Sequence, residues 1–412
     1  MLKFWFKIPL WQRVVGALVL GIIAGRVMGS DAEQIKWIGD LFIKSIKMLV
    51  VPLIFFSLVS GIAALGDLKK LGNVGGKALL LFATTGIISV SLGLTMGTIF
   101  QPGVGLDINL AASGASPIRP DTSITAMILA LIPENPIMAM AQANILPVII
   151  FAMLFGVALL MAGDDAAPLI RGVDAGSIVM QKMTMLVMEL TPFGVFALMA
   201  WVTGTFGWAA LKPLAVLVGL NYAGCFIVIF GLYPIIIKFI AKLPIIDFFR
   251  GIVDAQAVAF STASSNAALP VTLRCVQRNL GVSKSVSSFT VALGATINMN
   301  GTAMYLGLVA LFGAQLYGID LTWTSYFLIA LTATLGSVGA AGIPGSGLVM
   351  MSLVLTSIGV PLETIAFVAG INHIMDMMRT MTNVTGDATV AVAVGRMANE
   401  IDVEEYESAD DV

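Results

Sequence analysis

The chain has 412 residues, of which 58% are apolar and 11% are charged, and its mean hydropathy is +0.97. Soluble domains have about 45–50% apolar and about 25% charged residues, so this composition excludes a water-soluble enzyme. The apolar runs are long and unbroken, whereas an outer-membrane barrel alternates polar and apolar residues over segments of about 10 residues. We therefore expect an all-α polytopic membrane protein.

Six predicted helices occupy residues 1–243. They consist of Leu, Val, Ile, Met, Ala and Phe with small residues interleaved, which let neighbouring helices approach closely. Lys and Arg gather in alternate connections, and the positive-inside rule then predicts that both termini are cytoplasmic. The expected location is the inner (plasma) membrane of a bacterium or archaeon. The expected helices span residues 10–29, 36–66, 75–101, 125–163, 177–206 and 211–243.

The composition of the apolar segments changes after about residue 244. The later apolar segments contain Ser, Thr, Asn and Gly where a lipid-facing helix has few. An unsatisfied backbone group in hydrocarbon costs several kcal/mol, so these segments are expected to line a cavity enclosed by protein. The predicted order is a hairpin at about 245–275, a helix at about 283–318, a hairpin at about 325–358, a helix at about 361–397 and an acidic cytoplasmic tail at 398–412.

Two of these segments repeat one pattern. The serine-rich tip AFSTASSNAALP ends in Pro270, and the helix after it is expected to be interrupted at Asn298–Thr302. The Gly/Pro tip GSVGAAGIPGSG is followed by a helix expected to be interrupted at Asn383–Asp387. A hairpin and then a broken helix, occurring twice, is typical of an inverted-repeat transporter with its substrate site near the bilayer midplane. Two unrelated glycine kinks are the alternative.

Three charged residues lie inside the last apolar stretch. Asp376, Arg379 and Asp387 each cost on the order of 3 kcal/mol to place in a bilayer on insertion scales. Their spacing, with Asn383 between them and Thr380 beside them, puts them on one helical face. A purely structural Asp376–Arg379 pair is the alternative interpretation. It leaves Asp387 without a counter-charge.

This face suits a zwitterion that carries an additional acid. Asp376 can accept hydrogen bonds from an ammonium group, and Arg379 can hold a carboxylate with two parallel hydrogen bonds. A second carboxylate can rest on Asn383, Ser265 and backbone N–H groups of the hairpins, helped by helix dipoles. Aspartate and glutamate have these groups.

Asp387 indicates a cation site. With the carbonyls around Gly294, Asn298 and Asn383 it offers hard oxygen ligands for a small cation. A bound Na⁺ would neutralise Asp387, which couples ion binding to substrate binding. Na⁺ is expected as a co-transported ion rather than a catalytic cofactor.

Other chemistry is poorly supported. The chain has one histidine and two cysteines, so it has no His/Cys metal cluster and no disulfide framework. No nucleophile–base pair is evident, so we expect no enzyme, and we expect no nucleic-acid partner. A channel or receptor-like protein whose hairpins line a pore is the alternative class.

At these motifs the chain resembles the dicarboxylate/amino acid:cation symporters, the glutamate transporter family. The likeness covers nearly the whole chain and is specific in STASSNAALPVTLR, GATINMNGTA, GAAGIPGSG and DMMRTMTNVTGD. The resemblance implies a homotrimer, with eight transmembrane helices and two re-entrant hairpins in each subunit. Residues 1–243 would form mainly a trimerisation scaffold, with helices 3 and 6 joining a transport domain at 244–397 that moves as an elevator.

The resemblance also assigns the site residue by residue. The substrate would contact Ser264, Ser265, Thr302, Gly342, Ile343, Pro344, Gly345, Asp376, Arg379, Thr380 and Asn383. One Na⁺ would bind at Gly294, Asn298, Asn383 and Asp387. Another would bind at Thr296, Met299, Ser337, Val338 and Ala340. A third would involve Thr84, Thr85 and Asn300.

Several positions depart from the family pattern. Asn300 replaces the aspartate of the motif N-M-D-G-T, and losing this carboxylate predicts fewer coupled sodium ions or altered coupling. Ala263, Asn266 and Asn372 also differ from archaeal relatives.

Substrate class depends on few residues. C4-dicarboxylate members lack the equivalents of Asp376 and Pro344, and neutral amino acid members lack the arginine at Arg379. This chain has all three, so acidic amino acids are the leading substrates. A proton-coupled acidic amino acid carrier and a C4-dicarboxylate carrier remain alternatives.

Overall fold

The computed structural model describes residues 8–63, 73–105, 129, 131–339, 342 and 344–408. These residues form helices joined by short connections, and the one β-type pairing within them is an isolated bridge between Val282 and Ile401. The polytopic all-α class is therefore confirmed, whereas the count of eight transmembrane helices stays a prediction. Five described segments are long and apolar enough to cross a bilayer: Leu10–Ala63, Val74–Phe100, Ile145–Met188, Trp208–Ala241 and Lys284–Leu316.

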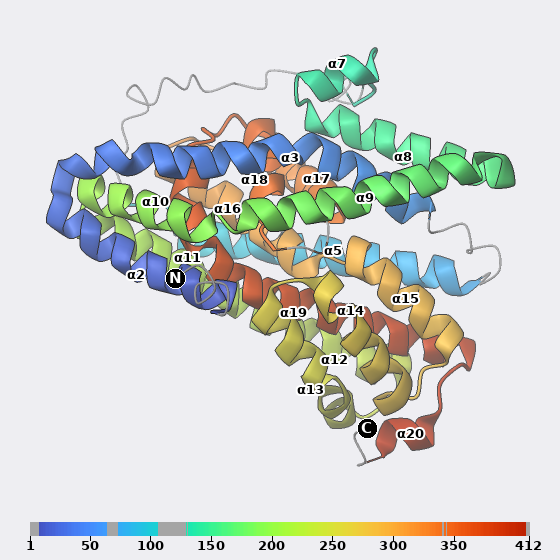
Figure 1. Cartoon of the computed structure of the whole chain (residues 1–412). Helices are drawn as coiled ribbons and strands as arrows, with labels where there is room; N and C mark the ends of the chain where they lie inside the picture. The colour runs from blue at the N-terminus through green and yellow to red at the C-terminus, as the bar shows by residue number, and fades with distance from the viewer. Residues whose placement is uncertain are drawn as a thin grey trace.

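One group of helices packs together on one side of the molecule (Figure 1). Small residues allow its closest approach, because a Cβ added to Gly21 would lie 2.6 Å from the carbonyl oxygen of Phe196. Arg13 of α2 also forms an ion pair at 2.7 Å with Glu189, which lies between α9 and α10. The members are α2 (Leu10–Met28), η1 (Gly29–Ile35), α3 (Lys36–Ala63), α8 (Ile145–Ala162), α9 (Ala167–Met188) and α10 (Thr191–Phe206).

Two helix predictions in this group are wrong. The helix expected at 125–163 is instead the short α7 (Pro136–Ala141) followed by α8, and Ala143 between them has a φ of +53°. Residues 125–128 and 130 lie outside the described residues. The helix expected at 177–206 is two helices, α9 and α10, because Pro192 in the first turn of α10 has no N–H to continue the preceding helix.

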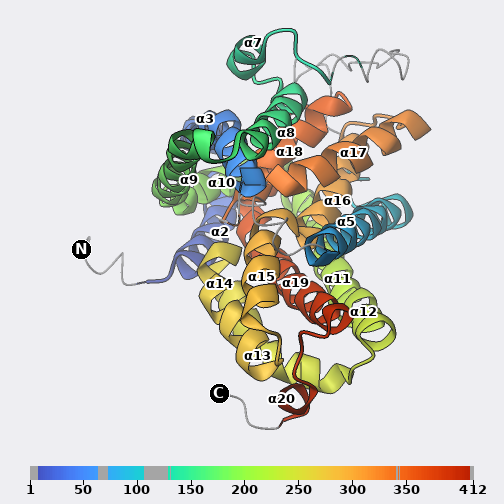
Figure 2. The same cartoon turned by 90° about the vertical axis from the view of Figure 1, so that its right-hand side faces the viewer.

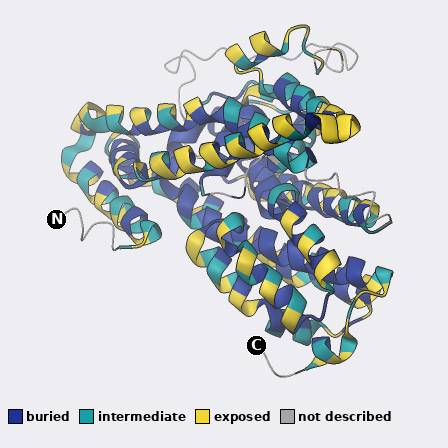
Figure 3. Ribbon diagram, turned by 45° about the vertical axis from the view of Figure 1, so that its right-hand side comes forward, coloured by how far each residue is buried: buried dark blue, intermediate teal, exposed yellow. Residues whose placement is uncertain are grey.

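The second group surrounds α19 (Thr364–Ala398), a helix of 35 residues. Figures 1 and 2 show α13–α15 on one side of α19 and α11 and α12 on another. α19 is almost entirely buried although it contains charged residues, and Figure 3 shows exposed residues gathered on the outer helices. The division into a fixed scaffold and a moving domain stays a prediction.

The elements of this second group follow in chain order. α11 continues through two π-helical segments to Ala241, so the helix expected at 211–243 is largely present. The bounds are α5 (Asn73–Phe100), α11 (Leu211–Ile227), η6 (Val228–Leu232), α12 (Tyr233–Ile236), η7 (Ile237–Ala241), α13 (Ile245–Thr262), α14 (Ser265–Arg274), η8 (Cys275–Asn279), α15 (Lys284–Ile297), α16 (Asn300–Leu316), α17 (Trp323–Gly339), α18 (Ser346–Ser357) and α20 (Val403–Glu407).

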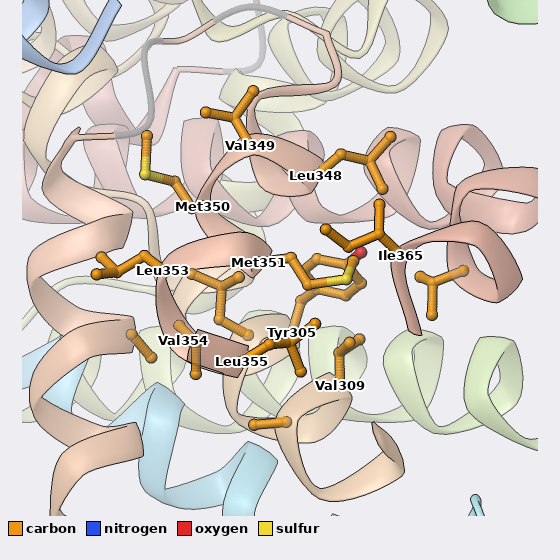
Figure 4. Packing of buried hydrophobic residues seen from close by; sticks show 14 of the residues in the cluster. Tyr305, Val309, Leu348, Val349, Met350, Met351, Leu353, Val354, Leu355 and Ile365 are labelled. Carbon is orange, nitrogen blue, oxygen red and sulfur yellow. The ribbon is translucent and has the colours of Figure 1, made fainter. Parts of the chain in front are cut away.

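The second hairpin packs against buried residues of α16 and α19. Figure 4 shows Leu348, Met351 and Leu355 of α18 facing Tyr305 and Ile365 from α16 and α19. All five side chains are buried. At about 25 cal/mol per Å² of apolar surface removed from water, such packing sets the position of the hairpin tip relative to the broken helix α16.

The segment after α19 is tied to the first hairpin. The N–H of Asp402 donates to the carbonyl of Gly281 at 2.8 Å, and the N–H of Ser283 donates to the carbonyl of Glu400 at 2.9 Å. Tyr406 is buried, and its hydroxyl donates to the carbonyl of Pro244 at 2.9 Å. Residues 399–408 therefore connect the base of α13 with the α14–α15 connection.

Gly281 makes this connection possible, and its replacement by alanine is expected to release the segment. Its φ is +61°, and an added Cβ would lie 2.2 Å from the carbonyl oxygen of Asp402. The left-handed conformation alone costs a non-glycine residue about 1–2 kcal/mol. We expect Gly281→Ala to lower the melting temperature of the detergent-purified protein and to expose residues 399–408 to protease. Gly163→Ala is the matched control, because Gly163 has a φ of +60° and no atom within 4 Å of its Cβ position. Equal changes in both variants would contradict this role of the contact.

Candidate functional site

The tips of the two hairpins touch each other. Ala263 ends α13 with a φ of +50°, and Ser264 caps α14 by accepting from the N–H of Ala267 at 3.2 Å. The hydroxyl of Ser264 also donates to the carbonyl of Gly342 at 2.8 Å, and the N–H of Asn266 donates to the same oxygen at 3.0 Å. The first tip therefore turns at residues 263–264.

The position predicted for Pro270 is wrong. It was expected to end the first tip but lies inside α14, six residues beyond the cap Ser264. Pro270 has no N–H to donate to the carbonyl four residues earlier, and α14 nevertheless continues past it to Arg274.

The first predicted interruption is confirmed and the second is wrong. α15 ends at Ile297, α16 begins at Asn300, and Asn298 and Met299 between them have non-helical dihedral angles. α19 runs without a break through Asn383–Asp387. The two N-x-x-G motifs therefore have different conformations.

Packing explains the glycine in the second motif. A Cβ on Gly386 would lie 2.5 Å from the hydroxyl of Tyr233 and 2.6 Å from Nδ2 of Asn298. Gly386 is thus required for close approach of neighbouring side chains rather than for a kink. The threonines around it donate their hydroxyls to carbonyls four residues earlier, which is compatible with a helix: Thr382, Thr385 and Thr389.

Side chains of the unbroken helix α19 form hydrogen bonds with groups at the break between α15 and α16. Oδ1 of Asn383 accepts from the N–H of Gly301, in the first turn of α16, at 2.8 Å. Nδ2 of Asn298 donates to Oδ1 of Asp387 at 2.9 Å and lies 3.4 Å from the carbonyl of Asn383. Side chains of the predicted polar face of α19 therefore supply partners that the break in α15–α16 lacks.

Arg379 lies fully buried at the centre of this arrangement. Its Nη2 donates to Oδ1 of Asp376 at 2.7 Å and to Oδ1 of Asn372 at 3.1 Å. Its guanidinium stacks over the ring of Tyr305, 3.7 Å from the centroid. Nε and Nη1 have no hydrogen-bond partner among the described residues. The Asp376–Arg379 pair is thus present, but it uses only part of the donor capacity of the arginine.

The unused donors lie beside the start of α18. A Cβ on Gly347, in the first turn of α18, would lie 2.5 Å from Nη1 of Arg379. The second oxygen of Asp376 accepts from the N–H of Gly345 at 2.8 Å. The free N–H groups and dipole of a helix N-terminus favour an anion, as does the guanidinium. The charge and the donors at this place therefore favour a carboxylate as ligand.

Asp387 is the second buried charge, and among the described residues no basic side chain forms an ion pair with it. Gly294 allows α15 to come close, since an added Cβ would lie 2.4 Å from Oδ1 of Asp387. Oδ1 of Asn298 is buried without a partner. A carboxylate beside an unpaired amide oxygen provides hard donors suited to an alkali or alkaline-earth cation.

The remaining predicted substrate residues have different surroundings. Ser265 and Thr302 are buried at the starts of α14 and α16, and Thr380 is buried on α19. Pro344 is half-buried in the second tip. Ile343 lies outside the described residues.

The residues predicted for a second ion come from two elements. Thr296 and Met299 lie at the end of α15 and in the break, and Sδ of Met299 is 3.1 Å from Nδ2 of Asn383. Ser337 and Val338 lie at the end of α17, which packs against α15. The fifth predicted residue, Ala340, lies outside the described residues.

At the predicted third ion site, Asn300 is engaged in neutral hydrogen bonds. Its Nδ2 donates to the hydroxyl of Tyr233 at 3.0 Å, and that hydroxyl donates to the carbonyl of Thr382 at 3.0 Å. Thr85 is buried, whereas Thr84 is exposed, and both hydroxyls donate to carbonyls of their own helix.

Sequence reasoning does not identify Tyr305 or Tyr233 as part of the site. Tyr305 follows the predicted residue Thr302 by three positions on α16, so helical spacing could have indicated it. Tyr233 lies on α12, far from the motifs in sequence, and no local pattern indicates its contact with Asn300.

Two facing hairpins, a broken helix and buried charges that lack full partners define a secondary membrane transporter. A profile of the sodium:dicarboxylate symporter family matches residues 10–397, and the chain belongs to this family.

Individual relatives agree with this placement over nearly their full length. The chain is 36% identical over 411 residues to the proton/glutamate-aspartate symporter of Escherichia coli (strain K12), with 95% of this chain and 93% of the relative covered. It is 35% identical over 399 residues to a proton/sodium-glutamate symport protein of Geobacillus stearothermophilus, with 94% and 93% covered. It is 32% identical over 411 residues to a C4-dicarboxylate transport protein of Rhizobium johnstonii (strain DSM 114642 / LMG 32736 / 3841), with 98% and 92% covered.

These relatives are transporters rather than enzymes, as expected for this chain. Their names include two substrate classes, acidic amino acids and C4-dicarboxylates, and two driving ions, H⁺ and Na⁺. Family membership therefore establishes a symporter of this general kind and leaves the particular substrate and ion to the chemistry of the site.

Proposed function

We propose that the protein is a symporter that carries acidic amino acids, aspartate or glutamate, into the cell together with Na⁺. The observation that carries this proposal is that only some of the hydrogen-bond donors of Arg379 have partners. Both hydrogens of Nη2 are held by Asp376 and Asn372, whereas Nη1 and Nε are free. In this state the arginine cannot offer a complete two-hydrogen edge to a carboxylate without releasing Asp376 or Asn372.

An acidic amino acid resolves this competition. Its ammonium group can donate hydrogen bonds to Asp376 in place of Arg379. Its side-chain carboxylate can then accept hydrogen bonds from Nη1 of Arg379 and from Nη2, which no longer donates to Asp376. Each buried charge of the internal pair thus finds a new partner of opposite sign. Recognition of the amine and recognition of the side-chain carboxylate become one linked event.

A C4-dicarboxylate lacks the ammonium and cannot make this exchange. It would draw Arg379 away and leave Asp376 buried and unpaired. Removing one partner of a buried ion pair costs about 3–5 kcal/mol, which corresponds to more than about 100-fold in affinity. Asp376 therefore favours amino acids over dicarboxylates.

Asp387 supports Na⁺ as the coupled ion. Its carboxylate is buried at 1% exposure next to the unpaired Oδ1 of Asn298. A monovalent cation there would compensate the charge through the oxygen donors of Gly294, Asn298 and Asn383. The neutral Asn300–Tyr233 contact supports the absence of a further ion at the predicted third site.

Assembly, movement and location also form part of this proposal. We propose a homotrimer in the inner membrane, with both termini cytoplasmic and the elements around α19 moving as an elevator. The motifs shared with the family support these points.

Uptake into proteoliposomes tests the proposal. Radiolabelled L-aspartate is supplied with an inward Na⁺ gradient, with a proton gradient alone, or with neither, and unlabelled L-aspartate, L-glutamate or succinate is added as competitor. We expect concentrative uptake under the Na⁺ gradient and competition by succinate at least about 100-fold weaker than by aspartate itself. Uptake driven by protons without Na⁺ would overturn the ion assignment. Equal competition by succinate would overturn the substrate assignment, and absence of concentrative uptake would favour a channel.

A further inference from the structure

His373 is a buried polar side chain that the proposed mechanism does not use. It is the one histidine of the chain and is 4% exposed. Within the part of the chain that the structure describes, neither Nδ1 nor Nε2 has a hydrogen-bond partner. A buried polar atom left unsatisfied costs about 1–3 kcal/mol, so two on one ring require an explanation.

The ring lies next to the substrate site. His373 precedes Asp376 by one turn of α19, and helical spacing puts it in the same row as Thr380, two turns further on. Asp376 and Arg379 are close enough to interact electrostatically with the ring. Because these two charges are paired, the site has no net charge beside the ring before substrate binds.

The helices that contact α19 add many ionisable groups, although α10 and α18 are exceptions. α10 and α18 contain none. α16 contributes Tyr305, whose hydroxyl is bonded to Asn372, and α11 contributes Tyr222, whose hydroxyl donates to the carbonyl of Ile374. The others on α2, α3, α5 and α11 are Arg13, Arg26, Lys36, Asp40, Lys44, Lys47, Lys77, Lys212 and Cys225. The elements α12–α15, η7 and η8 also contact α19, and they contribute Tyr233, Lys238, Asp247, Arg250, Asp254, Arg274, Cys275, Arg278 and Lys284.

Several of these groups are occupied elsewhere. Arg13 pairs with Glu189, and Lys36 pairs with Glu33. Lys77 donates to the carbonyl of Met397 at the opposite end of α19. Arg13, Lys36 and Lys77 are not among the charges that act on His373, whereas Asp376 and Arg379 are.

We propose that His373 is the proton-binding group that compensates the charge of the bound substrate, so that the carrier takes up a proton with its acidic amino acid. This inference rests on the proposed function. Asp376, Arg379 and a substrate with one ammonium and two carboxylates together carry one net negative charge. A proton from solution that binds to a ring nitrogen of His373 forms an imidazolium and brings the buried cluster to neutrality.

This arrangement gives a definite sign to the pH dependence. If the substrate complex holds more protons at His373 than the free carrier does, affinity for the substrate rises as the pH falls. Histidine is the side chain that ordinarily changes charge between pH 5 and 8, and the substrate itself keeps its charges in that range. The slope cannot exceed tenfold in affinity per pH unit for one proton.

The test is calorimetric titration of the purified carrier with L-aspartate at saturating Na⁺, from about pH 5.5 to 8.5. We expect wild-type Kd to fall with decreasing pH by several-fold per unit within part of this range. His373→Gln keeps a polar side chain but cannot be protonated, so its Kd is expected to change less than twofold over the range. A wild-type slope retained in His373→Gln would overturn the proton role while leaving aspartate binding, and the proposed function, intact.

A second measurement needs no variant. Repeating the wild-type titration in two buffers of different ionisation enthalpy gives the number of protons taken up on binding. We expect a maximum between one half and one proton per carrier. No proton uptake at any pH in the range would overturn the inference even if His373→Gln proved unstable. Absence of aspartate binding to the wild-type carrier at every pH would instead overturn the proposed function.

Discussion

Replacing Arg379 with alanine is expected to abolish recognition of aspartate, with Kd rising at least about 1000-fold. The substitution removes the guanidinium that would hold the side-chain carboxylate and leaves Asp376 buried without its partner at 2.7 Å. Asp376 would still accept an ammonium group, so a neutral amino acid can become the better ligand. Arg379→Lys keeps the charge but loses the planar donor edge and the stacking on Tyr305, and we expect a loss of about 100-fold. Titration of each purified variant with aspartate, alanine and serine measures these changes.

Arg396→Ala provides the matched control. Arg396 lies in the last turn of the same helix and is exposed, so its loss is expected to change aspartate affinity less than twofold. Unchanged aspartate affinity in Arg379→Ala would sink the assigned role of Arg379 and would favour the purely structural interpretation of the Asp376–Arg379 pair.

Asp387→Asn is expected to remove the effect of Na⁺ and, at the same time, to stabilise the ion-free carrier. The carboxylate of Asp387 is buried with Asn298 as its hydrogen-bond partner and has no compensating charge, so its ionised form is costly without a cation. A bound ligand stabilises the folded state by RT ln(1 + [L]/Kd). We therefore expect Na⁺ to raise the melting temperature of the wild type but not of the variant, and the variant to melt higher than the wild type without Na⁺. Aspartate affinity in the variant should no longer depend on Na⁺.

Asp254→Asn makes the same chemical change at an exposed position. Asp254 on α13 pairs with Arg274 at 2.8 Å, and both side chains are about half exposed or more, so this pair contributes little to stability. Its Na⁺ response should match that of the wild type. A full Na⁺ response in Asp387→Asn would show that the cation binds elsewhere and would contradict the assignment.

Local features of the chain were sufficient to predict its class and the location of its chemistry. Hydropathy and low charge content follow from composition, and they identify a polytopic helical membrane protein. The cost of charge in a bilayer makes Asp376, Arg379 and Asp387 informative wherever they occur. Helical spacing places them on one face, and the structure brings that face against the break at Asn298.

Contacts between distant segments determined the features that the sequence did not predict, such as which of the two similar motifs interrupts a helix. Asn298 and Asn383 begin similar motifs, yet only the first interrupts a helix. Asn298 follows the end of α15, where its side chain donates to Asp387 of α19, and Asn383 of α19 accepts from the backbone N–H of Gly301 in the first turn of α16. Gly386 lies inside the unbroken α19, and Tyr233 and Asn298 fill the space where a side chain would lie.

Contacts between distant segments also determine the arrangement of the charged site. The spacing of Asp376 and Arg379 on α19 predicts that they can pair, and the amino-acid sequence shows this without a structure. That Nη1 and Nε stay free depends on Tyr305 from α16, which covers one face of the guanidinium, and on the hairpin tip at Gly345, which holds Asp376. Periodicity and hydropathy report on neighbours along one helix, whereas the unpaired donors result from the distances between helices, which only the packed fold establishes.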